Sequence, residues 1–161
     1  MFKYLVLFLC FLFLGCEINS QQIVKPKKFN FNDIKFNAVT KKITYDIGDS
    51  NTDTNDIKQL IKYWFDNKIK TNGFDGTLEV VINKLDINRT KQKEYYQISI
   101  ELNILFKVES GDLTKRKTYD IKSNEYGEIK GSFAINDQEN LDLNIIHQSL
   151  NSISQKLKKI I

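Results

Sequence analysis

The sequence has few of the residues from which metal sites, disulfides and catalytic centres are usually built. The 161-residue chain contains one histidine, His147, and two cysteines, Cys10 and Cys16, both close to its beginning. A zinc site needs several histidine or cysteine ligands, which these residues cannot supply. Nothing in the sequence resembles a nucleophile elbow, so a Ser-His-acid triad has no support. We therefore expect a protein without enzymatic activity, metal or other cofactor.

Glycine, proline and net charge set further limits. The seven glycines are scattered singly, so the chain has no glycine-rich loop to hold a phosphate. The formal net charge of +4 is small, and charges of both signs are interspersed. This is typical of a solvated surface, and we expect no nucleic-acid partner. The single proline, Pro26, lies in residues 17–28, which show no hydrophobic periodicity and are predicted to form a flexible tether.

The first residues of the chain combine the features of an export signal. Lys3 precedes an unbroken apolar run over residues 5–14, which ends at Gly15 and Cys16. A charged start, a short apolar segment and a small residue before the cleavage site are typical of such signals. A membrane-spanning helix needs about 20 apolar residues, and this run is much shorter. Residues 1–15 are therefore predicted to be removed on export.

The motif Phe13-Leu14-Gly15-Cys16 resembles the lipobox of bacterial lipoproteins. The resemblance implies cleavage before Cys16, a diacylglycerol on its sulfur and a further acyl chain on its new amino group. Two or three chains hold a protein on a membrane without a spanning segment. The alternative is an ordinary signal peptide, with Cys16 an unmodified thiol. Glu17 rather than aspartate follows the cysteine, which by the enteric sorting rule of this class indicates the outer membrane, facing the periplasm.

Alternating apolar residues predict several strands. Residues 29–47 show shifts of phase, which predict one bent strand or two short ones. Residues 78–87 are predicted to form a strand with a bulge near Asn83, and residues 88–93 a polar turn. The best alternation covers residues 96–108, where apolar and polar side chains follow each other without a fault. It predicts a long central strand of a sheet that is covered on one side only.

Two stretches have the spacing of amphipathic helices. The first is predicted to end at Asn72-Gly73 and has an apolar face in which Trp64 is expected to lie in the core. This face consists of Ile57, Leu60, Ile61, Trp64, Phe65 and Ile69. The second is predicted to begin at an Asn136/Asp137 cap and to run to residue 161, with His147 on its flank at the surface or boundary. Its seam consists of Leu143, Ile146, Leu150, Ile153, Leu157 and Ile160.

A basic run opens the last predicted strand, at Lys115, Arg116 and Lys117. Such a run suits an edge strand, where lysine discourages aggregation. It could equally contact an anionic lipid or lipopolysaccharide. Both interpretations stay open. Residues 124–133 contain two glycines and are predicted to be a loop or a frayed extension.

The polar loop over residues 48–55 has a weak likeness to a calcium-binding loop. Asp49, Asn51 and Asp53 alternate as the first ligands of such a loop do. Thr54 and Leu60 stand where it requires glycine and glutamate. The segment is therefore predicted to be a loop and helix cap.

The predicted order, β-α-β-β-β-α, defines an α+β fold in which two helices pack on one face of a mixed sheet of about four strands. We expect a signal over residues 1–15, a lipidated tether over residues 16–28 and a single domain over residues 29–161. In element order the chain resembles small bacterial envelope lipoproteins: the YajG-like group, the LptE-like group and the auxiliary lipoproteins of lipid transporters. The likeness spans roughly residues 55–157 and is carried by GTLEVVINKLDI, YYQISIELNI, KRKTYD and GSFAINDQENLDLNIIHQSLNSIS.

This resemblance implies no catalytic residues. It implies a lipid-anchored, non-catalytic accessory or assembly factor of an outer-membrane or lipid-transport complex, which contacts an envelope protein through its open sheet face or last helix. The alternative is a module that binds a lipid or a glycolipid such as lipopolysaccharide, as LptE-type proteins do. The chain begins its mature part with Cys16-Glu17-Ile18, whereas Cys-Gly-Phe is common in the LptE-like group.

Overall fold

The computed structural model of the protein describes residues 29–45, 55–112 and 114–161. The predicted export signal, Cys16, the tether and the calcium-like segment before Asn55 lie outside these residues. The elements, in chain order, are β1 (Ile34–Phe36), β2 (Thr40–Tyr45), α2 (Asn55–Lys68), β3 (Ile69–Thr71), β4 (Thr77–Gln92), β5 (Tyr95–Glu109), β6 (Arg116–Lys130) and α3 (Ile135–Lys158).

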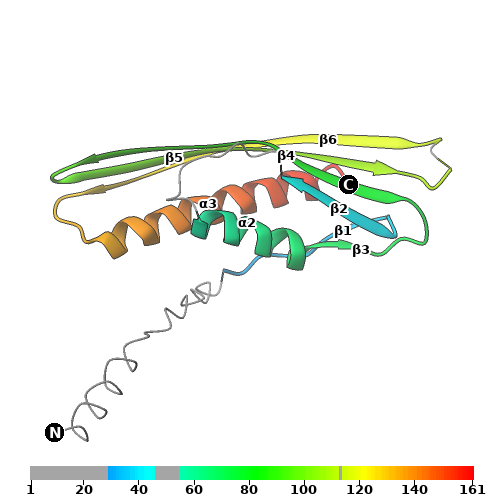
Figure 1. Cartoon of the computed structure of the whole chain (residues 1–161), viewed down its shortest axis with the longest axis horizontal. Helices are drawn as coiled ribbons and strands as arrows, with labels where there is room; N and C mark the ends of the chain where they lie inside the picture. Colours follow the sequence, from blue (N-terminus) through cyan, green and yellow to red (C-terminus); the bar gives the residue numbers. More distant parts are fainter. Residues whose placement is uncertain (1–28, 46–54, 113) are drawn as a thin grey trace, which may run out of the picture.

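The main sheet has the strand order β2-β4-β5-β6, and both helices lie along the same face of it (Figure 1). β2 pairs parallel with β4, whereas β4 with β5 and β5 with β6 pair antiparallel. β1 and β3 form a second, small parallel sheet at the level of the helices. The predicted α+β class, the mixed four-stranded sheet and the two helices on one face are confirmed. The sequence prediction missed β3 and the small sheet.

The hydrophobic core lies between the main sheet and the helices. On β5 every second residue from Tyr96 to Phe106 is buried, which confirms the dry face predicted from the alternation. Trp64 on α2 is fully buried, as predicted. The pairing of β4 with β5 shifts between Ile82 and Lys84, which confirms the bulge near Asn83.

Two segments predicted to be turn or loop are strand instead. β4 continues to Gln92, so that only two residues connect it to β5, and β6 continues to Lys130. Both extensions find their hydrogen-bond partners on β5, which sequence alternation alone does not reveal. Gly127, which had indicated a loop, lies within β6 at a close approach, since a Cβ there would come within 2.6 Å of Ile145.

The end of α2 also differs from the prediction. The helix ends at Lys68, and Ile69 pairs with Ile34 of β1 instead of extending the helix to Asn72-Gly73. The ammonium group of Lys41 donates hydrogen bonds to the carbonyls of Phe65 and Ile69, at 2.9 and 2.8 Å. A cation at this position satisfies the last carbonyls of the helix and complements its dipole.

α3 begins at Ile135, one residue before the predicted Asn136/Asp137 cap. Asp137 contributes from inside the first turn, where its carboxylate accepts a hydrogen bond of 2.8 Å from the Ala134 N–H. Four residues of the predicted seam are fully buried, namely Ile146, Leu150, Ile153 and Leu157. The seam therefore packs within the protein's own core, although Ile160 lies beyond the helix end and is half exposed. In the described part of the chain, neither helix has the length and hydrophobicity to cross a bilayer.

Candidate functional site: a pocket at one end of the sheet

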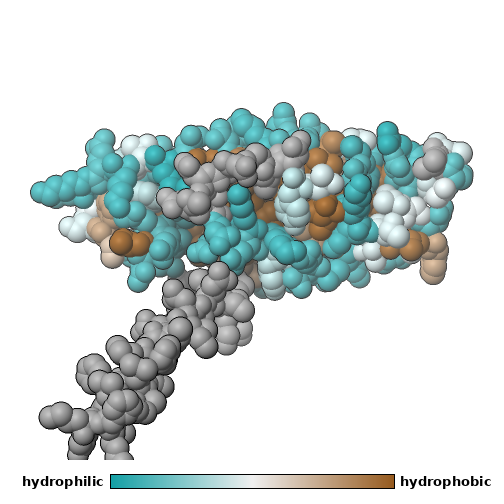
Figure 2. All heavy atoms as spheres, in the orientation of Figure 1, coloured by the Kyte–Doolittle hydropathy of each residue, from teal (hydrophilic) through white to brown (hydrophobic). Residues whose placement is uncertain are grey.

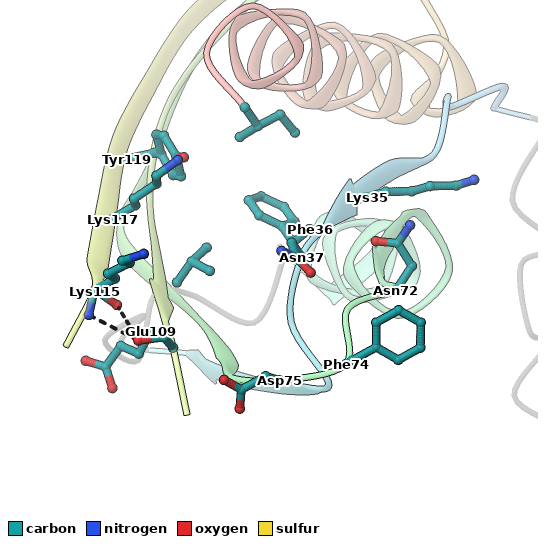
Figure 3. Close-up of a pocket in the computed structure, with 13 residues that line it drawn as sticks. Lys35, Phe36, Asn37, Asn72, Phe74, Asp75, Glu109, Lys115, Lys117 and Tyr119 are labelled. Atoms are coloured by element: carbon teal, nitrogen blue, oxygen red, sulfur yellow. Dashed lines mark hydrogen bonds between the residues drawn. The ribbon is translucent and has the colours of Figure 1, made fainter. Parts of the chain in front are cut away.

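A pocket of about 690 Å³ opens at the end of the molecule where the β3–β4 connection, the β5–β6 turn and β1 meet (Figure 3). This volume lies within the range of small-molecule sites. We call it the end pocket. It is lined by Lys35, Phe36, Asn37, Asn72, Phe74, Asp75, Val108, Glu109, Ser110, Lys115, Lys117, Tyr119 and Ile161.

One side of the end pocket is apolar. Phe36 is buried and stacks on the ring of Phe106, with ring centroids 5.5 Å apart and an angle of 14° between the rings. Val108 and Tyr119 are partly buried against the same core cluster. In Figure 3 the ring of Phe36 faces Tyr119 across the hollow. A ligand in this pocket would therefore contact aromatic and aliphatic carbon.

The predicted basic run is divided between the two faces of β6. Lys117 and Tyr119 share one face and point toward the hollow, and Lys115 lies beside them at its rim (Figure 3). Arg116 lies between the two lysines and points to the other face, because side chains alternate along a strand. There it forms an ion pair with Glu109 across the ladder. The structure thus brings two of the three predicted contact residues to the pocket.

The two side-chain carboxylates of the end pocket already have partners, whereas Lys115 and Lys117 at the start of β6 do not. Asp75 accepts hydrogen bonds from the N–H groups of Gly76 and Gly111, at 2.7 and 3.0 Å, and Glu109 is paired with Arg116. Among the described residues, the ammonium groups of Lys115 and Lys117 have neither a hydrogen-bond acceptor nor an ion-pair partner. The pocket rim therefore carries positive charge that the protein itself does not neutralise.

Glycine is required at one of the two turns that shape the pocket and permits a close side-chain contact at the other. Gly76 has a φ of +85°, and a Cβ on it would overlap the carbonyl oxygen of Glu109. A Cβ on Gly111 would overlap the carboxylate of Asp75. The Asp75 carboxylate therefore joins the β3–β4 connection to the β5–β6 turn at a short distance from Gly111, which a side chain there would lengthen. These contacts fix the outline of the pocket.

At the opposite end, a partly buried polar cluster holds the start of α3 to the β4–β5 hairpin. Asp142 accepts hydrogen bonds from Arg89 at 2.8 Å and from the Tyr96 hydroxyl at 2.7 Å. Burial is the larger cause and the hydrogen bond to Asp142 the second cause that together raise the pKa of Tyr96 to about 12. The cluster therefore has a structural role, since it connects α3 to β4 and β5. In the described ranges, no group of three or more His, Cys, Asp or Glu side chains is placed to hold a metal ion.

His147 lies at the boundary of the core, away from the end pocket. Its ring is 4.7 Å from the rings of both Phe29 and Phe31, and its Nε2 lies 3.2 Å from Asn151 Nδ2. Burial lowers the pKa of His147, and a hydrogen bond with the backbone of Asn30 acts in the opposite direction. Through these ring contacts, His147 packs the beginning of the described chain against α3.

The free energy of unfolding should decrease as the pH falls below about 6.5, the ordinary pKa of histidine. The pKa of His147 is lower in the folded state, so the unfolded chain takes up a proton first. The contribution of neutral His147 to the free energy of unfolding is therefore present above pH 6.5. It is lost as the pH falls through the folded-state pKa of His147. Urea unfolding at pH 7.5 and 5.5 measures it. His147→Asn should show a smaller decrease, and an identical decrease in both proteins would contradict the assignment.

No family model matches the chain, and no curated protein matches it. Among solved structures it is similar to a minor lipoprotein from Acinetobacter baumannii, with 14% identity, a TM-score of 0.37, and 76% of this chain and 90% of that chain covered. A lipoprotein from Caulobacter crescentus is 4% identical, with a TM-score of 0.39, and the match covers 71% of this chain and 85% of that chain. A lipoprotein from Neisseria meningitidis is 7% identical, with a TM-score of 0.30, and the match covers 76% of this chain and 100% of that chain. At such TM-scores these similarities establish neither family nor function, and the resemblance to the YajG-like and LptE-like groups stays a prediction.

Proposed function

We propose that this chain is a non-catalytic, lipid-anchored protein of the bacterial cell envelope that binds an anionic amphiphile, a lipid or glycolipid, in the end pocket. The observation that carries the proposal is the pairing pattern at the rim. Lys115 and Lys117 are unpaired beside the apolar side of the pocket, whereas the carboxylates of Asp75 and Glu109 are already engaged. An anionic headgroup would provide acceptors for the lysines, and its apolar part would bury carbon against Phe36.

The lipid anchor rests on the lipobox-like motif that ends at Cys16. Acyl chains on this residue would hold the domain on a membrane, and Glu17 favours the outer membrane, facing the periplasm. The tether of about a dozen residues would average roughly 20 Å end to end. The end pocket would then work at a membrane surface, where amphiphiles are available.

A second candidate function is that of an accessory factor that contacts an envelope protein. Both helices cover the same face of the main sheet, which leaves its other face uncovered by the described elements (Figure 1). On this open face, Asn103 Oδ1 is buried without a hydrogen-bond partner among the described residues. Co-purification with a larger complex after gentle detergent extraction would support this function, and migration as a single species under cross-linking would count against it.

The pocket function predicts that an anionic short-chain lipid stabilises the protein. The probe is dihexanoyl phosphatidylglycerol, added to the full lipidated chain in a nonionic detergent, with dihexanoyl phosphatidylcholine as the neutral counterpart. At 100 times its Kd the anionic lipid should stabilise the folded state by about 2.7 kcal/mol. Lys115→Gln with Lys117→Gln should weaken binding about 25-fold, at about fivefold per lysine. The stabilisation at the same lipid concentration then falls to about 1 kcal/mol.

The matched control is Lys91→Gln with Lys93→Gln, which removes two exposed lysines at the β4–β5 end of the sheet. This variant should bind the anionic lipid as the wild type does. Equal stabilisation by both lipids, or an equal loss in both double variants, would contradict the proposed pocket function.

A further inference from the structure

We infer that the end of the domain that holds the end pocket docks directly on an anionic bilayer, with Phe74 inserted among the lipid headgroups. The inference rests on the proposed lipid anchor, because acyl chains on Cys16 would bring the domain to a membrane. It goes beyond that anchor by assigning an orientation. The domain would stand with its end pocket toward the lipids.

Phe74 is the most exposed large apolar residue in the described part of the chain. The residue is fully exposed, with a relative accessibility of 102%, and it lies on the β3–β4 connection. Val39 is 51% exposed and lies beside this connection, since its N–H donates a 3.0 Å hydrogen bond to the Gly76 carbonyl. Figure 2 shows apolar surface at the tip where this connection lies. Phe74 and Val39 together place exposed apolar surface at this end of the domain.

The connection that carries Phe74 is held in place on both sides. The Asn72 N–H donates to the Phe36 carbonyl at 3.1 Å, and the Gly73 N–H donates to the Ala38 carbonyl at 3.0 Å. On the other side, Asp75 binds the Gly111 N–H of the β5–β6 turn. The Phe74 ring is therefore presented to solvent by a fixed backbone. A preorganised aromatic side chain binds without the entropy loss of ordering a loop.

Charge at the same end matches an anionic surface. Lys35 also belongs to the end pocket and points away from Phe36, outward from the domain (Figure 3). With Lys115 and Lys117 it gives three lysines that lack an ion-pair partner among the described residues. Each lysine close to anionic headgroups raises membrane affinity about fivefold. An exposed aromatic ring and unpaired lysines at the same end of the domain fit a headgroup layer, in which cations and apolar side chains are both favourable.

The test places a tryptophan at the tip and asks whether lipids brominated close to their headgroups quench its fluorescence. The full lipidated chain carrying Phe74→Trp is reconstituted into vesicles of brominated phosphatidylcholine with one quarter phosphatidylglycerol. Trp64 is the only tryptophan of the natural chain and is fully buried, so its emission stays constant. We expect the added emission of Phe74→Trp to fall by at least half. Ile135→Trp, at the far end of α3, should be unaffected, since Ile135 is 68% exposed and distant from the docked end.

The outcomes separate the docking from the proposed pocket function. Equal quenching at both positions, or at neither, would overturn the docking, while the stabilisation by soluble phosphatidylglycerol would be unaffected. Quenching that persists without phosphatidylglycerol, or in Phe74→Trp with Lys115→Gln and Lys117→Gln, would overturn the role of charge. The intact mass of each sample shows the acyl chains on Cys16. A protein without them would contradict the anchor and thereby the inference that rests on it.

Discussion

Gly76→Ala should destabilise the folded state by roughly 3 kcal/mol and should remove the end pocket. Two effects add at this position. A side chain at a φ of +85° costs an L-residue about 1 kcal/mol, and the new Cβ would overlap the carbonyl of Glu109. Relief of this overlap requires the β3–β4 connection to move from the β5–β6 turn, at a further cost of about 2 kcal/mol. Urea unfolding followed by circular dichroism measures the loss of stability.

Gly131→Ala is the matched control for this prediction. Gly131 has a φ of +90°, but a Cβ there would meet no heavy atom within 4 Å. The substitution should therefore lower the free energy of unfolding only by the cost of a side chain at positive φ, about 1 kcal/mol. It should leave the stabilisation by phosphatidylglycerol unchanged, whereas Gly76→Ala should abolish it. Equal losses of stability in the two variants would show that the contact between the two turns does not hold the pocket.

Cys16→Ala should abolish lipidation completely, which is the largest effect that we expect on localisation. The proposed acyl chains would require the Cys16 sulfur, and a single chain gives only marginal membrane binding, so their loss would remove the anchor. The measurement is incorporation of an acyl label in the host, followed by separation of membrane and soluble fractions. Cys10→Ala is the control, because Cys10 lies within the apolar run and should be removed with it. Label retained in Cys16→Ala would contradict the assignment.

The two layers of the fold could be predicted because each shows a regular period in the sequence. The alternation along β5 and the seam of α3 identify the two surfaces that must bury each other. β3 could not be predicted, because a three-residue strand has no readable period and its partner β1 lies far upstream. The second half of β6 was missed because its outward residues are polar and Gly127 resembles a turn residue, although it makes room for Ile145.

The candidate site was predictable only in part. The basic run was visible in the sequence. Once the run is placed on a strand, the alternation of side chains puts Lys115 and Lys117 on one face and Arg116 on the other. The apolar side of the pocket was not visible, because Phe36, Val108 and Ile161 come from distant parts of the chain. The pairing of Glu109 with Arg116, which leaves the lysines unpaired, depends on the register across the β5–β6 turn.

Native mass spectrometry of the lipidated protein, released from its host membranes in a mild detergent, tests the proposed function most directly. We predict a population that carries one additional anionic amphiphile in the wild type and in Lys91→Gln with Lys93→Gln. The same mass should be absent from Lys115→Gln with Lys117→Gln. A wild-type spectrum that shows only the acylated chain, or an amphiphile retained equally by both double variants, would contradict binding in the end pocket.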